Sequence, residues 1–136
     1  MYRVLLPVDH SESRARAQVD ATAALPHASD EVEAIVLHVF DDEETAEKTT
    51  VQQTPAGKQT VELLRAEGVH FETETGHGDP ERQITNHAEE HDVDMIILGG
   101  RKRSPLGALV FGSVSQAVIL DSERPVAVTG SGASDS

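Results

Sequence analysis

The chain has 136 residues, a length that suits one domain with a substantial core. It carries 24 acidic residues against 11 Lys plus Arg, a formal net charge of −13, and only one Tyr, three Phe and no Trp, which together argue against nucleic acid as a partner. The absence of cysteine excludes disulfides, thiol catalysis and cysteine-ligated metal centres.

Apolar strands and amphipathic helices alternate along the chain. The pattern predicts strands over residues 3–8, 33–40, 69–75, 93–99 and 126–129. It predicts helices over residues 11–25, 57–67, 79–91 and 113–121, with start signals at Ser11 or Ser13 and at Asp79-Pro80 and a stop signal at Gly68. Residues 41–56 are polar without a clear period, so we predict one long loop there and a disordered tail over 131–136.

Five strands alternating with four helices predict a single α/β domain over residues 1–130. We expect an open parallel sheet in the order 3-2-1-4-5, with helices on both faces. Ligands of such sheets bind beyond the carboxyl ends of the strands, where the strand order reverses. Pro7-Val8-Asp9 ends the first strand and Gly99-Gly100 ends the fourth, and in this order the two strands are neighbours. The topology therefore predicts a ligand site between these strand ends.

The segment 93–114 carries the strongest functional signal. Its strand ends at Gly99-Gly100, a loop with the consecutive cations Arg101, Lys102 and Arg103 follows, and Gly112-Ser113 opens a helix. Free N–H groups, the helix dipole and the small size of glycine suit this arrangement to a phosphate group. The glycines alone are more typical of an ordinary strand end and helix cap. Three adjacent cations in so acidic a chain favour a small phosphate-bearing ligand over a random solvated charge run.

From Arg3 to Thr129 the chain resembles universal stress proteins. The resemblance rests on four segments, at residues 4–13 (Val-Leu-Leu-Pro-Val-Asp-His-Ser-Glu-Ser), 37–41 (Leu-His-Val-Phe-Asp), 78–80 (Gly-Asp-Pro) and 94–114. Members that bind ATP carry a motif of three glycines. Two residues separate the first glycine from the second, nine residues separate the second from the third, and Ser or Thr follows the third. Gly99, Gly112 and Ser113 match this motif, whereas Lys102 stands where the second glycine belongs. The resemblance implies a Rossmann-like fold akin to that of the adenine-nucleotide alpha hydrolases.

The resemblance also implies a bound adenine nucleotide, ATP or AMP, with or without Mg²⁺. Asp9 and the backbone of Val39 would contact adenine or ribose. Pro7 and Val8 would line the base pocket, and Leu98 and Gly99 would flank the ribose. From the residues alone, Asp9 is equally typical of a helix cap, and Val39 of ordinary core.

The phosphates would lie at the start of the last helix. Gly112, Ser113 and Val114 would donate backbone N–H groups, together with the Ser113 hydroxyl, although Ser113 alone is as typical of a helix cap. Lys102 permits two interpretations. Its ammonium can pair with a phosphate that Arg101 and Arg103 also contact. Alternatively, its side chain can obstruct the close approach of the ligand that glycine allows.

The histidines give weaker indications of a functional site. His87 and His91 lie four residues apart on the predicted third helix, but the His-Glu-x-x-His order is missing and a solvated helix face is favoured over a metal site. His38 is expected to be a hydrogen-bonded residue of the core or the switch-point edge.

No general base is evident beside the phosphate loop, so fast turnover is not expected. A nucleotide-binding regulator or sensor is favoured; the alternatives are a slow ATPase in which Asp9 or His10 positions water, and a dimeric stress protein without nucleotide.

Compartment and assembly follow from the rest of the pattern. The N-terminus has no signal-peptide pattern and no apolar stretch approaches the roughly 18 residues of a membrane span, so we expect a cytoplasmic protein without a membrane partner. Dispersed carboxylates and only three lysines indicate adaptation to concentrated salt, a merely acidic mesophilic protein being the alternative. The last strand is uncharged, which predicts a homodimer through Val126, Ala127 and Val128 unless the polar tail shields this edge.

Overall fold

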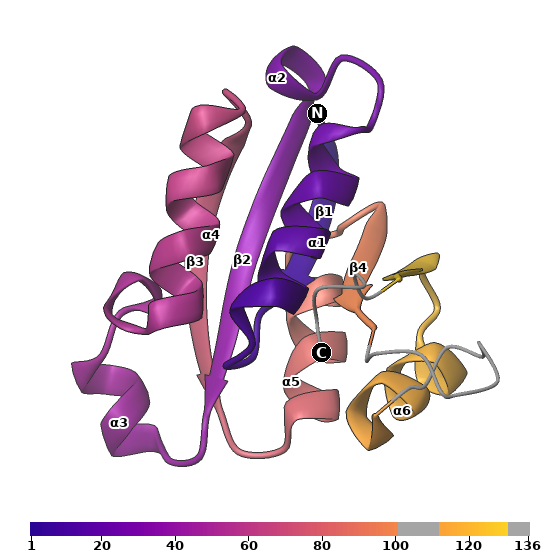
Figure 1. Ribbon diagram of the computed structural model, residues 1–136. Helices are drawn as coiled ribbons and strands as arrows, with labels where there is room; N and C mark the ends of the chain where they lie inside the picture. The colour runs from indigo at the N-terminus through magenta and orange to yellow at the C-terminus, as the bar shows by residue number, and fades with distance from the viewer. Residues whose placement is uncertain (101–111, 131–136) are drawn as a thin grey trace, which may run out of the picture.

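Five parallel strands form one sheet in the order β3-β2-β1-β4-β5 (Figure 1). The computed structural model describes residues 1–100 and 112–130, and the bounds of the strands are β1 Tyr2–Pro7, β2 Val32–Phe40, β3 His70–His77, β4 Met95–Gly99 and β5 Val126–Thr129. The predicted fold class and strand order are confirmed. The cationic loop and the predicted tail lie outside the described residues.

Helices cover both faces of the sheet. Their bounds are α1 Glu12–Ala23, α2 Ala28–Glu31, α3 Glu43–Lys48, α4 Pro55–Ala66, α5 Pro80–Glu90 and α6 Ser113–Asp121, with a 3₁₀ turn at Val51–Gln53. Figure 1 shows α1 and α4 side by side over one face, and α5 packs against α6 on the other. None of the described helices is long and apolar enough to cross a bilayer.

The core lies in two layers because side chains alternate across the central strand. Val4 and Leu6 of β1 join the cluster beneath α1 and α4, whereas Leu5 between them joins the cluster beneath α5 and α6. All three side chains are fully buried. A strand buried on both faces reads as a continuous apolar run, which is why the sequence pattern located β1 correctly.

The predicted helix signals act as expected at three positions. Ser11 caps α1 by accepting a hydrogen bond from the Arg14 N–H, and Asp79 caps α5 by accepting from the Arg82 N–H. Gly68 follows α4 with a φ of +72°, in the left-handed region where a side chain is strained.

The prediction of one long loop over 41–56 is wrong. Asp42 caps α3, and its hydrogen bond from the Thr45 N–H lowers the pKa of the Asp42 carboxyl. The 3₁₀ turn follows, and α4 begins at Pro55 rather than at Gly57, because the Thr54 hydroxyl accepts from the Gly57 N–H. A Cβ at Gly57 would collide with the Val51 carbonyl oxygen, so close packing, not a helix start, requires this glycine. The short α2 was not predicted either.

Candidate functional site

A cavity of about 390 Å³ opens at the carboxyl ends of β1 and β4, within the size range of small-molecule sites. Nine of the eleven residues predicted for the site line it: Pro7, Val8, Asp9, Val39, Leu98, Gly99, Gly112, Ser113 and Val114. The other two, Lys102 and Arg103, lie outside the described residues. Segments far apart in the sequence thus meet around one concavity, because the strand order reverses here.

A buried glutamine holds the two strands where they part. β1 pairs with β4 through Val4↔Met95 and Leu5↔Ile96. Further along, the Gln18 amide of α1 donates to the carbonyl oxygens of Pro7, at 2.8 Å, and of Ile97, at 2.9 Å. Its side chain therefore bridges the strands at the base of the cavity. Sequence reasoning missed Gln18, although a polar residue beside the apolar positions of a helix was an available signal.

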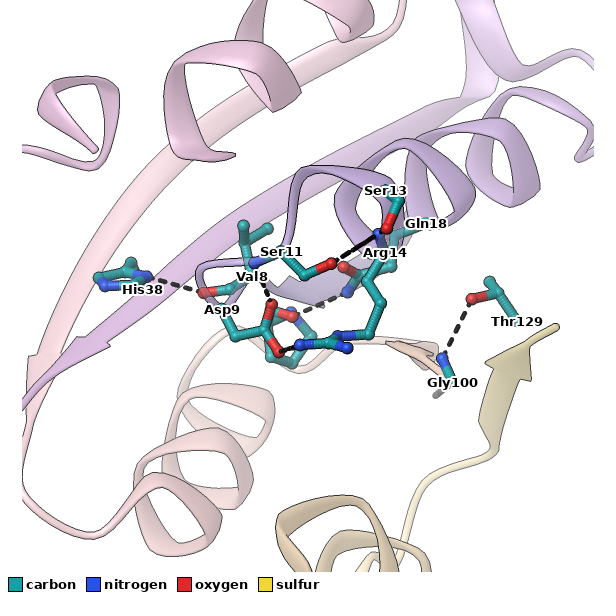
Figure 2. Close-up of polar contacts among 10 residues, drawn as sticks. Val8, Asp9, Ser11, Ser13, Arg14, Gln18, His38, Gly100 and Thr129 are labelled. Carbon is teal, nitrogen blue, oxygen red and sulfur yellow. Dashed lines mark hydrogen bonds and ion pairs between the residues drawn. The ribbon is translucent and has the colours of Figure 1, made fainter. Parts of the chain in front are cut away.

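Asp9 forms an ion pair with Arg14 at the rim of the cavity (Figure 2). Its Oδ1 accepts from the Ser11 N–H at 2.8 Å, and its Oδ2 accepts from Arg14 Nε at 3.0 Å and lies 2.9 Å from Nη2. The N-cap of α1 is Ser11, so Asp9 supports the turn before the helix and does not cap it. The Asp9 side chain is 52% exposed and faces the cavity opening. Arg14, which also lines the cavity, was not predicted from sequence.

Packing against α1 explains the first glycine of the motif. A Cβ on Gly99 would lie 2.8 Å from Cβ of Arg14, closer than two carbon atoms approach without displacement. The next residue is also tied down, since the Gly100 N–H donates to the Thr129 carbonyl oxygen at 3.0 Å. The same N–H lies 3.4 Å from the Thr129 hydroxyl oxygen, which is the contact between β4 and β5 that Figure 2 draws. The glycine is therefore required by the fold, whatever ligand the cavity takes.

The end of β2 supplies a third wall. His38 Nδ1 lies 2.7 Å from the Val8 carbonyl oxygen, and its ring stands edge-on to Phe40 with 4.6 Å between centroids. His38 is thus a hydrogen-bonded residue at the switch-point edge, as predicted. Val39 packs partly against the core and also lines the cavity, so its two interpretations are compatible.

The start of α6 forms the wall opposite β1. Gly112 is the N-cap residue and Ser113 is the first helical residue, so the interpretation of Ser113 as the cap is wrong. Because glycine has no side chain, the N-cap residue itself provides no hydrogen bond to the N–H groups of the first turn. Such a helix start presents N–H groups and the positive end of the dipole to the cavity. The arrangement can hold an anion.

The interpretation of His87 and His91 as part of a solvated helix face is wrong. Their side chains are only 12% and 17% exposed, and they face Glu72 and Glu74 of β3. Neither histidine lines the cavity. Alternation along β3 places the two glutamates under α5, which helical periodicity alone did not indicate.

Comparison with known proteins assigns the chain to a family. The model of the universal stress protein family matches residues 1–130. Universal stress protein YxiE of Bacillus subtilis is 39% identical over 67 residues, which are 49% of this chain and 45% of YxiE, so the match spans about half of either protein. A universal stress protein structure from Archaeoglobus fulgidus superposes with a TM-score of 0.74 at 29% identity, over 95% of this chain and 98% of that chain. The structure of the universal stress protein from the same organism in complex with dAMP has a TM-score of 0.69 at 24% identity, over the same shares of the two chains. The chain belongs to the universal stress protein family.

Proposed function

We propose that the cavity binds an adenine nucleotide, AMP or ATP, and that the protein acts as a nucleotide-dependent regulator or sensor. The observation that carries the proposal is the meeting of Asp9, Val39, Gly99 and the start of α6 around one cavity. The likeness to a fold that holds dAMP in the A. fulgidus protein is consistent with it.

The wall formed by β1 and β2 suits the nucleoside. Pro7 and Val8 offer apolar surface for the base, and the main chain at Val39 offers groups that can read a base edge. The half-exposed Asp9 carboxylate has room to accept a ribose hydroxyl or an adenine amino group. Arg14 offsets its negative charge, which would otherwise repel an anionic ligand.

The wall formed by α6 suits the phosphates. The first turn begins at Ser113, and its N-cap residue, Gly112, has no side chain that would cap the N–H groups or keep an anion from them. Arg101, Lys102 and Arg103 are sequence neighbours of this site and would add positive charge. Mg²⁺, where it accompanies ATP, would be carried mainly by the phosphate oxygens.

Binding is favoured over hydrolysis by the contacts of Asp9. Both of its oxygens already accept hydrogen bonds, from the Ser11 N–H and from Arg14. In the proposed complex the remaining acceptor capacity of Asp9 goes to the nucleoside, so this carboxylate is not free to take a proton from an attacking water. We therefore propose nucleotide occupancy, not turnover, as the signal.

Calorimetry with AMP and with ATP, each with and without Mg²⁺, tests the proposal. The double variant Gly112→Val/Ser113→Ala blocks backbone approach and removes a hydroxyl, and we expect about 1–3 kcal/mol weaker binding, or about 5- to 150-fold. Ser29→Ala, an exposed serine that does not line the cavity, is the matched control and should bind as the wild type does. Unchanged affinity in the double variant would refute the site, and no binding by the wild type would refute the function.

A homodimer through β5 is also proposed. β5 is an edge strand of the sheet, and Val126, Ala127 and Val128 remain partly exposed on it. In α6, Ile119 and Leu120 are exposed apolar side chains, Leu120 at 83%. An uncharged edge with apolar surface close to it in sequence favours pairing with a second copy.

A further inference from the structure

Three potential metal ligands meet between α5 and the edge strand β3. One ligand atom each from Glu74, His87 and His91 lies within 4.8 Å of the others. Glu74 Oε1 is 3.9 Å from His87 Nδ1 and 3.6 Å from His91 Nε2. None of the three residues lines the nucleotide cavity, so this cluster has no part in the function proposed above.

Secondary structure explains the convergence. His87 and His91, four residues apart at the end of α5, present their rings on one side, nearly parallel at 12° with centroids 6.0 Å apart. Glu74 and Glu72 are two residues apart on β3, so they point to the same face of the sheet. The histidine side chains are therefore held between the helix and the strand, largely out of solvent.

Two ring nitrogens of this cluster have no hydrogen-bond partner in the described part of the chain. Among the described residues, no hydrogen bond satisfies the buried atoms His87 Nδ1 and His91 Nε2. At 3.6 and 3.9 Å, the Glu74 carboxylate is too distant to accept from either ring. Imidazole nitrogens and a carboxylate that face one another without a hydrogen bond are an arrangement that a cation would stabilise.

A second carboxylate, that of Glu72, lies beside His91 and can orient its ring toward a cation. Glu72 Oε1 lies 3.4 Å from His91 Nδ1, on the other side of the ring from Glu74. A carboxylate in that position favours the tautomer with its proton on Nδ1, which leaves the Nε2 lone pair free. Metal-bound histidines are commonly oriented by such a carboxylate.

We propose that Glu74, His87 and His91 bind a divalent transition-metal ion, with Zn²⁺ as the best match, and that this ion clamps α5 to β3. Two histidines and one carboxylate form a ligand set that Zn²⁺ accepts, with water in the fourth position. Ca²⁺ and Mg²⁺ prefer oxygen ligands and do not match it. Tetrahedral bonds of about 2.1 Å place ligand atoms about 3.4 Å apart, so small side-chain rotations suffice to close the site.

Metal binding is tested on untagged full-length protein, freed of metal with a chelator and kept in a salt concentration at which circular dichroism shows it folded. Equilibrium dialysis against Zn²⁺ should give one tightly bound ion per chain, and Co²⁺ should give the visible absorption of a four-coordinate site. His87→Gln/His91→Gln should weaken Zn²⁺ binding at least tenfold and abolish the Co²⁺ spectrum. Glu72→Gln should weaken binding about 10- to 100-fold, since it removes an orienting partner and no ligand.

His77→Gln is the matched control, because His77 is an exposed histidine at the end of the same strand. Zn²⁺ should raise the unfolding midpoint of the wild type and this control, and not that of the double variant. Equal Zn²⁺ binding by the wild type and the double variant, or wild-type binding no stronger than that of Ca²⁺, would overturn the proposal. If the double variant does not fold, Glu74→Gln carries the same prediction with both histidines in place. Nucleotide affinity should not change in any of these variants.

Discussion

Gln18 offers the most direct test of how the fold joins the ends of β1 and β4 beside the cavity. Its amide is 1% exposed and donates to the carbonyl oxygens of Pro7 and Ile97, at 2.8 and 2.9 Å. Gln18→Leu keeps the approximate size of the side chain and removes both donors. The strand ends then lose the only described side chain that donates to both of these carbonyls.

The expected loss in free energy of unfolding comes from two buried acceptors, the carbonyl oxygens of Pro7 and Ile97. Each buried polar group left without its partner costs about 1–3 kcal/mol, and the added apolar surface of leucine returns part of this, so we expect about 2–4 kcal/mol less stability. With an unfolding entropy of about 2.1 cal/mol/K per residue over this chain, the midpoint should fall by about 7–14 °C. Thermal and urea unfolding followed by far-ultraviolet circular dichroism measure both quantities.

Gln59→Leu is the matched control. Its side-chain oxygen is buried without a hydrogen-bond partner among the described residues, so the same substitution there should be neutral or stabilising. The reasoning is refuted if Gln18→Leu unfolds within about 0.5 kcal/mol of the wild type, the ordinary range for a surface substitution. It is also refuted if the two leucine variants lose stability equally, because a general intolerance of leucine in these helices would then explain both.

Three further predictions concern charge and assembly. Lys102→Gly should weaken nucleotide binding at moderate salt if the ammonium pairs with phosphate, as we expect; calorimetry that finds tighter binding would instead mean that the side chain obstructs the site. Light scattering in multimolar KCl should give twice the chain mass of 14.6 kDa, and Val126→Lys/Val128→Lys should reduce it to the monomer, whereas a monomeric wild type would exclude the β5 dimer. The Asp121 carboxyl, through a hydrogen bond and its charge, raises the pKa of Glu81 above its usual 4.5, so ionisation of Glu81 opposes folding. The stability of Glu81→Gln relative to the wild type should therefore increase as pH rises from 4 to 7, and a constant difference in midpoint would show that this pair has no effect.

Local patterns predicted the sheet and most of its helices because the relevant forces act along short stretches of chain. β1 is buried on both faces and reads as an apolar run, and Ser11 and Asp79 cap helices through bonds to N–H groups three residues away. α3 escaped prediction because it buries none of its residues, so no apolar period marks it. Its signal was limited to the Asp42 cap, and a polar segment with one cap resembles a loop.

The position of the cavity was also predictable, for a topological reason. In a parallel sheet every strand ends at the same edge, so adjacent strands bring Pro7-Val8-Asp9 and Gly99 together once the order is known. Which side chains then contact one another was not predictable. The Asp9–Arg14 ion pair and the two hydrogen bonds of Gln18 depend on how α1 is rotated and placed over β1 and β4.

The histidine cluster shows the same division most clearly. Sequence spacing placed His87 and His91 on one side of a helix, as the structure has them. It did not indicate whether that side faces solvent or the sheet, because both environments tolerate histidine. Only the packing of α5 beside β3 brings Glu72 and Glu74, more than ten residues earlier in the chain, to within 4 Å of the two rings. Helical and strand periodicity act within one element, whereas the contacts that join these four side chains arise from burial of apolar surface between elements.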